Sequence, residues 1–182
     1  ARGIGTCKPK EAKIQKLKAK VRELTKRNRG RSPAQVIDEV GKAVRGWIAY
    51  YARGHFKKWI EDDFSPWMRR RIRQYVWKVW KTAKSRKKHL RKAGVPEWQI
   101  ARVSGWSCRK YWKMSLVMGR LLTNERLEHY FGLTDPVAVY TELHERRMKR
   151  DAELDFQAYL CRQHANEEAG RLLMEADMCG NW

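Results

Sequence analysis

The segment from Ser65 to Ser85 constrains the fold of this chain most strongly, because it carries a long and uninterrupted helical pattern. No Gly or Pro follows Pro66 until Gly94, and Ser65 and Pro66 are residue types typical of a helix N-cap and first turn. The apolar residues recur at steps of three and four and form one stripe: Met68, Ile72, Tyr75, Val76, Val79 and Trp80. Most other positions are cationic: Arg69, Arg70, Arg71, Arg73, Lys78, Lys81 and Lys84. The pattern predicts a helix that packs on one side and presents positive charge on the other.

Two earlier segments also have helical patterns. The first, residues 9–28, has a narrow apolar stripe in an otherwise basic surface, and the second, residues 33–53, has a broad apolar face. Ser32, Pro33 and Gln35 form a capping-box pattern at the start of the second. The sequence therefore predicts an all-α fold. A bundle of helices at 9–28, 33–53 and 66–84 is followed by short basic helices and a C-terminal helical tail.

Charge is distributed very unevenly along the chain. Residues 1–120 carry 34 Lys and Arg against 8 Asp and Glu, whereas residues 121–182 carry 7 against 12. So much positive charge repels itself, and a bound polyanion would relieve the repulsion. Nucleic acid is the expected polyanion. We expect no membrane partner, because no apolar run approaches the ~20 residues of a membrane span and the basic helices lack a clean apolar face.

The four cysteines are scattered, at positions 7, 108, 161 and 179. In a chain of this charge and size we interpret them as reduced thiols and expect a cytoplasmic location. The Cys161-x-x-His164 spacing lacks the paired arrangement of zinc sites, so the sequence predicts no metal site. No catalytic motif is present either, and we expect neither a catalytic residue nor a cofactor in this chain.

Five phrases agree in order and spacing with one known family: LTKRNRGRS (24–32), VRGWIAYYA (44–52), RRRIRQYVWKVWK (69–81), SRKKHLRKAGVPEWQI (85–100) and SCRKYWKMS (107–115). Together they resemble the maturase-specific region of group II intron reverse transcriptases. The resemblance covers about residues 8–140. One departure is that the last phrase lacks the family's Gly between Lys110 and Tyr111.

The resemblance implies a domain organisation and a function. Residues 1–84 would form the maturase-specific domain (thumb, or domain X), residues 85–140 a basic DNA- and RNA-binding segment, and residues 141–182 an acidic helical tail of unassigned role. The chain would bind group II intron RNA to promote its folding and splicing, as the C-terminal part of an intron-encoded reverse transcriptase. It would also contact the primer–template and the target DNA. The expected location is then the bacterial cytoplasm, with an organelle as the alternative.

The same resemblance implies where chemistry takes place. The family's polymerase motif Tyr-x-Asp-Asp is absent, so RNA-directed DNA polymerisation would belong to an upstream palm domain in the same or another chain. Splicing would be catalysed by the intron RNA. Mg²⁺ is expected for that RNA and for the palm.

The candidate nucleic-acid contacts are cations and aromatic residues of the matching phrases and of the basic helices. They are Arg27, Arg29, Arg31, Arg45, Arg69, Arg70, Arg71, Arg73, Lys78, Lys81, Arg86, Lys87, Arg109, Lys110, Tyr111 and Trp112. Lys and Arg would contact phosphates. Tyr111, Trp112 and Trp106 would either stack on unpaired bases or fill the core between short helices, and the sequence does not choose between these roles.

Two alternative functions remain open at the level of sequence. The chain could be the thumb fragment of a reverse transcriptase that serves another system, such as CRISPR adaptation. It could also be a general module for binding single-stranded nucleic acid, without preference for an intron.

Overall fold

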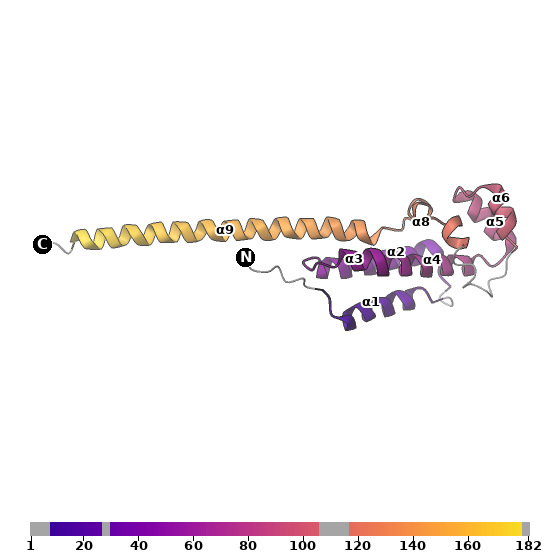
Figure 1. The fold of residues 1–182 in the computed structure, drawn as a ribbon, viewed down its shortest axis with the longest axis horizontal. Coiled ribbons are helices and arrows are strands. Elements are labelled where there is room, and N and C mark those ends of the chain that lie inside the picture. Colours follow the sequence, from indigo (N-terminus) through magenta and orange to yellow (C-terminus); the bar gives the residue numbers. More distant parts are fainter. Residues whose placement is uncertain (1–7, 27–29, 106–116, 180–182) are drawn as a thin grey trace. The chain divides into compact units, whose positions relative to one another are not determined.

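A computed structural model describes residues 8–26, 30–105 and 117–179 of the chain (Figure 1). Within these ranges the secondary structure is helical and contains no strand, which confirms the predicted all-α class. The chain divides into two compact units, residues 1–143 and residues 144–182.

Three helices of the first unit form the predicted bundle: α1 (Glu11–Leu24), α2 (Pro33–Tyr51) and α4 (Ser65–Val79). Helix α1 packs against α2, and α2 packs against α4. Their apolar stripes are buried, as the periodicity predicted, with Val21, Val40 and Val76 almost fully removed from solvent. At the start of α2 the capping box is present, because Ser32 Oγ accepts from the Gln35 backbone N–H at 3.3 Å and Gln35 Oε1 accepts from the Ser32 N–H at 3.1 Å.

Helix α4 begins differently from the sequence prediction. Ser65 does not cap it: the helical backbone already runs through α3 (Lys57–Trp59) and a π-helical turn, η1 (Ile60–Phe64), into α4. The side chains of Ile60 and Phe64 are buried, and the Trp59 and Phe64 rings stack with centroids 5.4 Å apart. Core packing of these apolar residues therefore keeps the helix continuous through Ser65, whose buried Oγ has no hydrogen-bond partner among the described residues.

Helix α4 also ends earlier than predicted, at Val79 rather than near residue 84. The backbone turns at Trp80, whose buried ring stacks on His89 with centroids 4.9 Å apart. Thr82 then starts a new helix, α5 (Ala83–Lys92), because its side chain accepts from the Ser85 N–H at 3.1 Å. Burial, together with the charges of Lys88 and Lys92, lowers the pKa of His89, which favours the neutral ring in this stack.

The remaining helices of the first unit extend the same core. They are α6 (Glu97–Val103), a helical segment at 117–121, α8 (Asn124–Phe131) and the first turns of α9 (Pro136–Cys179). Leu90, Ile100 and Leu127 join the buried residues of α1, α2 and α4 in one continuous cluster. The Tyr140 hydroxyl of α9 donates to the Gly54 carbonyl at 2.6 Å, so the start of α9 is anchored to the end of α2.

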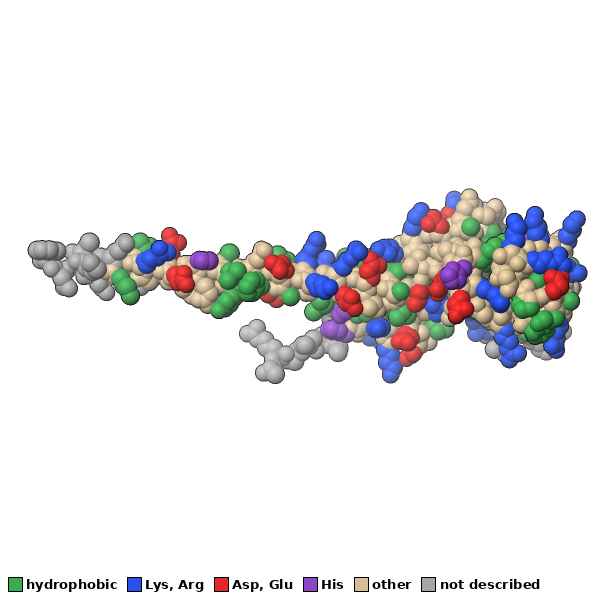
Figure 2. All heavy atoms as spheres, turned by 90° about the horizontal axis from the view of Figure 1, so that it is seen from above, with side chains coloured by type: hydrophobic (Ala, Val, Ile, Leu, Met, Phe, Trp, Pro, Cys, Tyr) green, Lys and Arg blue, Asp and Glu red, His purple; other side chains and the backbone are tan. Residues whose placement is uncertain are grey.

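The second unit is the continuation of α9 beyond residue 143. It exposes apolar side chains as well as charged ones (Figure 2). Leu154 and Phe156 are each exposed over 57% of their surface, and Leu172 over 61%. No helix in the described ranges is long and apolar enough to cross a bilayer.

Candidate nucleic-acid interface

A cleft of about 990 Å³ lies between the turn that follows α1 and the outer side of α4. This basic cleft is lined by Thr25, Lys26, Gly30, Arg31, Arg71, Gln74, Tyr75, Lys78, Val79 and Lys81. Five of these residues are cations and none is a carboxylate. Four of the cations come from two separate sequence phrases and were predicted contacts: Arg31, Arg71, Lys78 and Lys81. The fold brings all four to the lining of the basic cleft. The cleft is therefore a concentrated site of positive potential.

Hydrogen bonds hold the two walls of the basic cleft together. The Tyr75 hydroxyl on α4 donates to the Arg31 carbonyl at 2.6 Å. Arg71 Nε donates to Thr25 Oγ1 at 3.1 Å, and that hydroxyl donates to the Val21 carbonyl at 2.7 Å. These contacts join Thr25 and Arg31, which follow α1, directly to α4.

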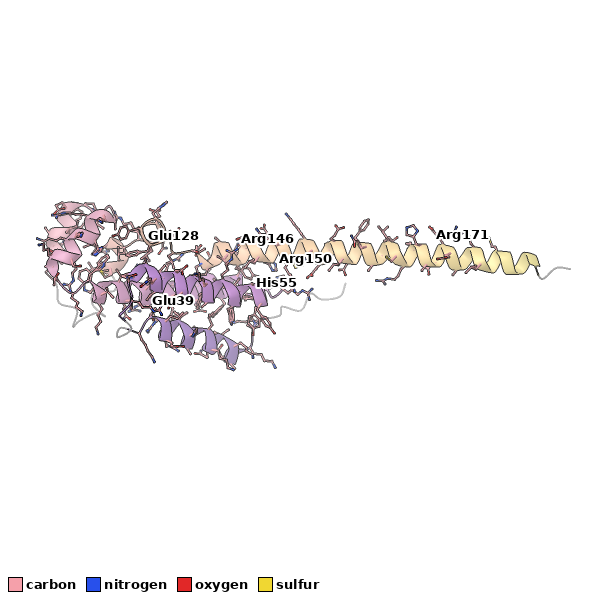
Figure 3. The ribbon with its side chains drawn as sticks, turned by 180° about the vertical axis from the view of Figure 1, so that it is seen from behind. Glu39, His55, Glu128, Arg146, Arg150 and Arg171 are labelled. Atoms are coloured by element: carbon pink, nitrogen blue, oxygen red, sulfur yellow. The ribbon has the colours of Figure 1, made fainter. Side chains whose placement is uncertain are left out.

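The cationic side chains of the basic cleft differ in whether they already form hydrogen bonds or ion pairs within the protein. Arg31 forms an ion pair with Glu39 of α2, and Arg71 contacts both Thr25 and the Trp67 ring. Glu39 is labelled in Figure 3. The side chains of Lys26, Lys78 and Lys81 are exposed and form no hydrogen bond or ion pair with any described residue. Three lysines are thus directly available to phosphate groups.

Three other predicted contacts, two on α4 and one on α5, form hydrogen bonds or ion pairs with protein groups. Arg69 lies 2.7 Å from Asp135 and 3.9 Å from Glu128 of α8. Arg73 Nε donates to the Leu122 carbonyl at 2.6 Å. These arginines tie α4 to the segment around α8.

Arg86 is almost fully buried, at 4% exposure. Its guanidinium donates to the carbonyls of Trp80 at 2.8 Å, Lys81 at 3.3 Å and Ser104 at 3.3 Å, and it lies 4.4 Å from the centre of the Trp77 ring. Two of these carbonyls belong to the break between α4 and α5. Arg86 therefore satisfies backbone groups that the break releases from the helix.

The other predicted contacts lie apart from the basic cleft. Arg45 of α2 is exposed and lies 3.6 Å from Glu142, Arg70 of α4 is half-buried, and Lys87 of α5 is exposed. The remaining predicted contacts fall outside the described residues, as does Trp106: they are Arg27, Arg29, Arg109, Lys110, Tyr111 and Trp112.

Sequence reasoning did not name six residues of the cleft wall as contacts: Thr25, Lys26, Gly30, Gln74, Tyr75 and Val79. Lys26 was part of the LTKRNRGRS phrase, and its neighbouring cations were the available signal. Tyr75 was assigned only to the apolar stripe; its ring is buried as expected, but its hydroxyl reaches the cleft wall. The described residues contain no group of three or more His, Cys, Asp or Glu side chains placed to hold a metal ion.

A helical unit with a basic cleft whose described lining contains no carboxylate is of the class suited to hold a polyanion. In a comparison with protein families, residues 14–94 match the model described as group II intron, maturase-specific domain. This part of the chain is therefore similar to the maturase-specific domain, the family that the sequence phrases between residues 24 and 94 indicated. No curated protein matches the chain. The matched segment extends from α1 to the end of α5 and includes every residue of the basic cleft.

Proposed function

We propose that this domain binds group II intron RNA and stabilises the folded form that splices. The observation that carries the proposal is the basic cleft, which lies wholly inside the maturase-specific segment. RNA helices that approach one another repel through their phosphates, and the lysines and arginines of the cleft would offset that repulsion. The protein's contribution is electrostatic and architectural, while the intron RNA with its Mg²⁺ performs the transesterifications.

The hydrogen bonds across the cleft support this role. Tyr75 and Arg71 of α4 hold Arg31 and Thr25 in place, so these two residues need little ordering when a ligand binds. Phosphate contacts of this kind supply affinity without reading sequence. Selectivity for the intron would then come from the shape of its folded RNA, which presents closely spaced phosphates at the right separation.

The proposal extends to the parent protein of this family. We infer that the chain works beside a polymerase palm and that the same positive surface supports the primer–template or the target DNA. The basic segment that begins at residue 85 supports this extension, because Lys87 and Lys88 of α5 are exposed. Binding of a primer–template duplex by the purified chain is the corresponding measurement, and no binding at low salt would contradict the extension.

A competition experiment tests the intron-specific part of the proposal. The full 182-residue chain is bound to a labelled, folded group II intron RNA at physiological salt with Mg²⁺, and unlabelled intron RNA or bulk transfer RNA is added. We expect intron RNA to compete about tenfold or more better than transfer RNA, because non-specific phosphate contacts alone are weak at that salt. Equal competition by the two RNAs would instead identify a general nucleic-acid-binding module.

A further inference from the structure

A second hollow, of about 220 Å³, lies outside the matched maturase-specific segment. This Trp98 pocket is lined by residues of α6 and of the helical segment 117–121: Trp98, Gln99, Arg102, Val103, Val117, Arg120 and Leu121. The floor of the pocket is apolar and is formed by Val103 and Leu121, which belong to the buried core. It shares no residue with the basic cleft.

Trp98 is unusual among the tryptophans that the structure describes. Trp77 and Trp80 are buried and Trp47, Trp59 and Trp67 are half-buried, whereas Trp98 is 67% exposed. An indole left open to water beside an apolar floor is a surface on which a flat, weakly polar ring can stack. The pocket therefore favours an aromatic ligand.

The rim of the Trp98 pocket is positively charged. Arg102 lies one helical turn after Trp98 on the same side of α6, and Arg120 lies on the opposite wall. Both are exposed, and neither pairs with a carboxylate of any described residue. The ligand is expected to carry negative charge next to its ring.

The carboxylate nearest in sequence does not neutralise this rim. Glu97 is the one acidic residue between Asp63 and Glu125 in the sequence. It accepts from Arg91, whose Nε lies 2.9 Å from Glu97 Oε2, and this hydrogen bond lowers the pKa of the Glu97 carboxyl. Figure 2 shows Lys and Arg side chains gathered at the end of the first unit that contains α5 and α6.

We propose that the Trp98 pocket holds one unpaired nucleobase of a single strand, stacked on Trp98, with the phosphates on either side of it bound by Arg102 and Arg120. The proposal deepens the proposed function, because it rests on this chain binding nucleic acid. An aromatic ring flanked by two phosphates is the chemistry that RNA loops and single-stranded DNA share. A duplex does not present such an accessible ring, because its bases are stacked in the interior of the helix.

Substitution of Trp98 tests this pocket in the full chain. Labelled U12 RNA, dT12 DNA and a 12-base-pair duplex serve as probes in fluorescence anisotropy. We expect Trp98→Ala to lower the affinity for the single strands about 5- to 100-fold, the range for loss of one stacked base, and to leave duplex affinity unchanged. Trp98→Phe should retain most of the affinity. A larger loss with U12 than with dT12 assigns RNA as the ligand, and equal losses assign single strands of either sugar.

Tyr50 provides the matched control, because it is an exposed aromatic residue of α2, at 81% exposure, and is not among the residues that line the pocket. Tyr50→Ala should leave single-strand affinity unchanged, and the melting temperatures of all variants should equal that of the wild type. The proposal is overturned if Trp98→Ala has no effect, if Tyr50→Ala lowers affinity equally, or if duplex affinity falls as much as single-strand affinity.

Failure of this inference is distinguishable from failure of the proposed function. Transfer RNA that competes as well as intron RNA, together with a Trp98→Ala loss on U12, contradicts only the intron-specific role. A clear preference for intron RNA, together with no Trp98→Ala effect on any single strand, contradicts only the pocket.

Discussion

Replacing Lys26, Lys78 and Lys81 together by alanine is expected to lower the affinity for intron RNA about 10- to 100-fold at low salt. The reason is that these three lysines line one cleft and their side chains form no hydrogen bond or ion pair with the described residues. An exposed charge pair contributes up to about 1 kcal/mol, so three lost lysine–phosphate pairs amount to about 1.5–3 kcal/mol. Titration of labelled intron RNA with the variant measures the effect.

Three lysines outside the basic cleft give the matched control. Lys57, Lys58 and Lys149 are exposed, and their replacement by alanine removes the same charge from the chain. We expect a much smaller loss of affinity from the control, because its lysines do not converge on one site. Equal losses from the two triple variants would show that net charge, rather than the cleft, accounts for binding. Neither variant should unfold at a lower temperature, because all six side chains are exposed.

Replacing Arg86 is expected to affect stability. Arg86→Lys keeps the positive charge but cannot reach the carbonyls of Trp80, Lys81 and Ser104 together, because an ammonium lacks the planar fork of a guanidinium. We expect the free energy of unfolding to fall by about 2–4 kcal/mol, since hydrogen bonds from a charged donor to buried carbonyls contribute about 1.5–3 kcal/mol and the stacking on Trp77 is also lost. Urea denaturation followed by circular dichroism measures this difference.

Lys87, the neighbour of Arg86, provides the control that distinguishes a structural role of Arg86 from a contact with nucleic acid. Lys87 is exposed on the same helix, so Lys87→Ala should leave the free energy of unfolding unchanged. An Arg86→Lys variant with wild-type stability and weakened RNA binding would contradict the account, because it would mean that the guanidinium contacts the ligand rather than the break between α4 and α5.

The helices of the bundle could be predicted from the sequence because the signals are local. The capping residues Ser32 and Gln35 lie beside the helix they start, and the apolar stripes of α1, α2 and α4 follow the helical period. The break at Trp80 was not predictable in this way. Its causes are the burial of Trp80 against His89 and the hydrogen bonds of Arg86, which depend on the tertiary structure.

Which arginines of α4 line the basic cleft could not be predicted from the sequence either. Arg69, Arg71 and Arg73 look equivalent in the sequence, yet only Arg71 lines the basic cleft. Arg69 is taken up by Asp135 and Arg73 by the Leu122 carbonyl, partners that lie far along the chain. A local pattern cannot show which cations face the ligand, because their partners are determined by how distant segments pack.

Salt dependence is the most direct test of the claim that the basic cleft binds phosphates. The affinity of the wild-type chain for folded intron RNA is measured between 50 and 200 mM monovalent salt, beside the Lys26, Lys78 and Lys81 triple variant. If the domain neutralises about 6–10 phosphates, wild-type affinity falls roughly a thousandfold or more across this range, and the magnitude of the logarithmic slope is smaller by about 2–3 in the variant. A wild-type affinity that stays constant across the range, or a slope that the triple substitution leaves unchanged, would contradict the account.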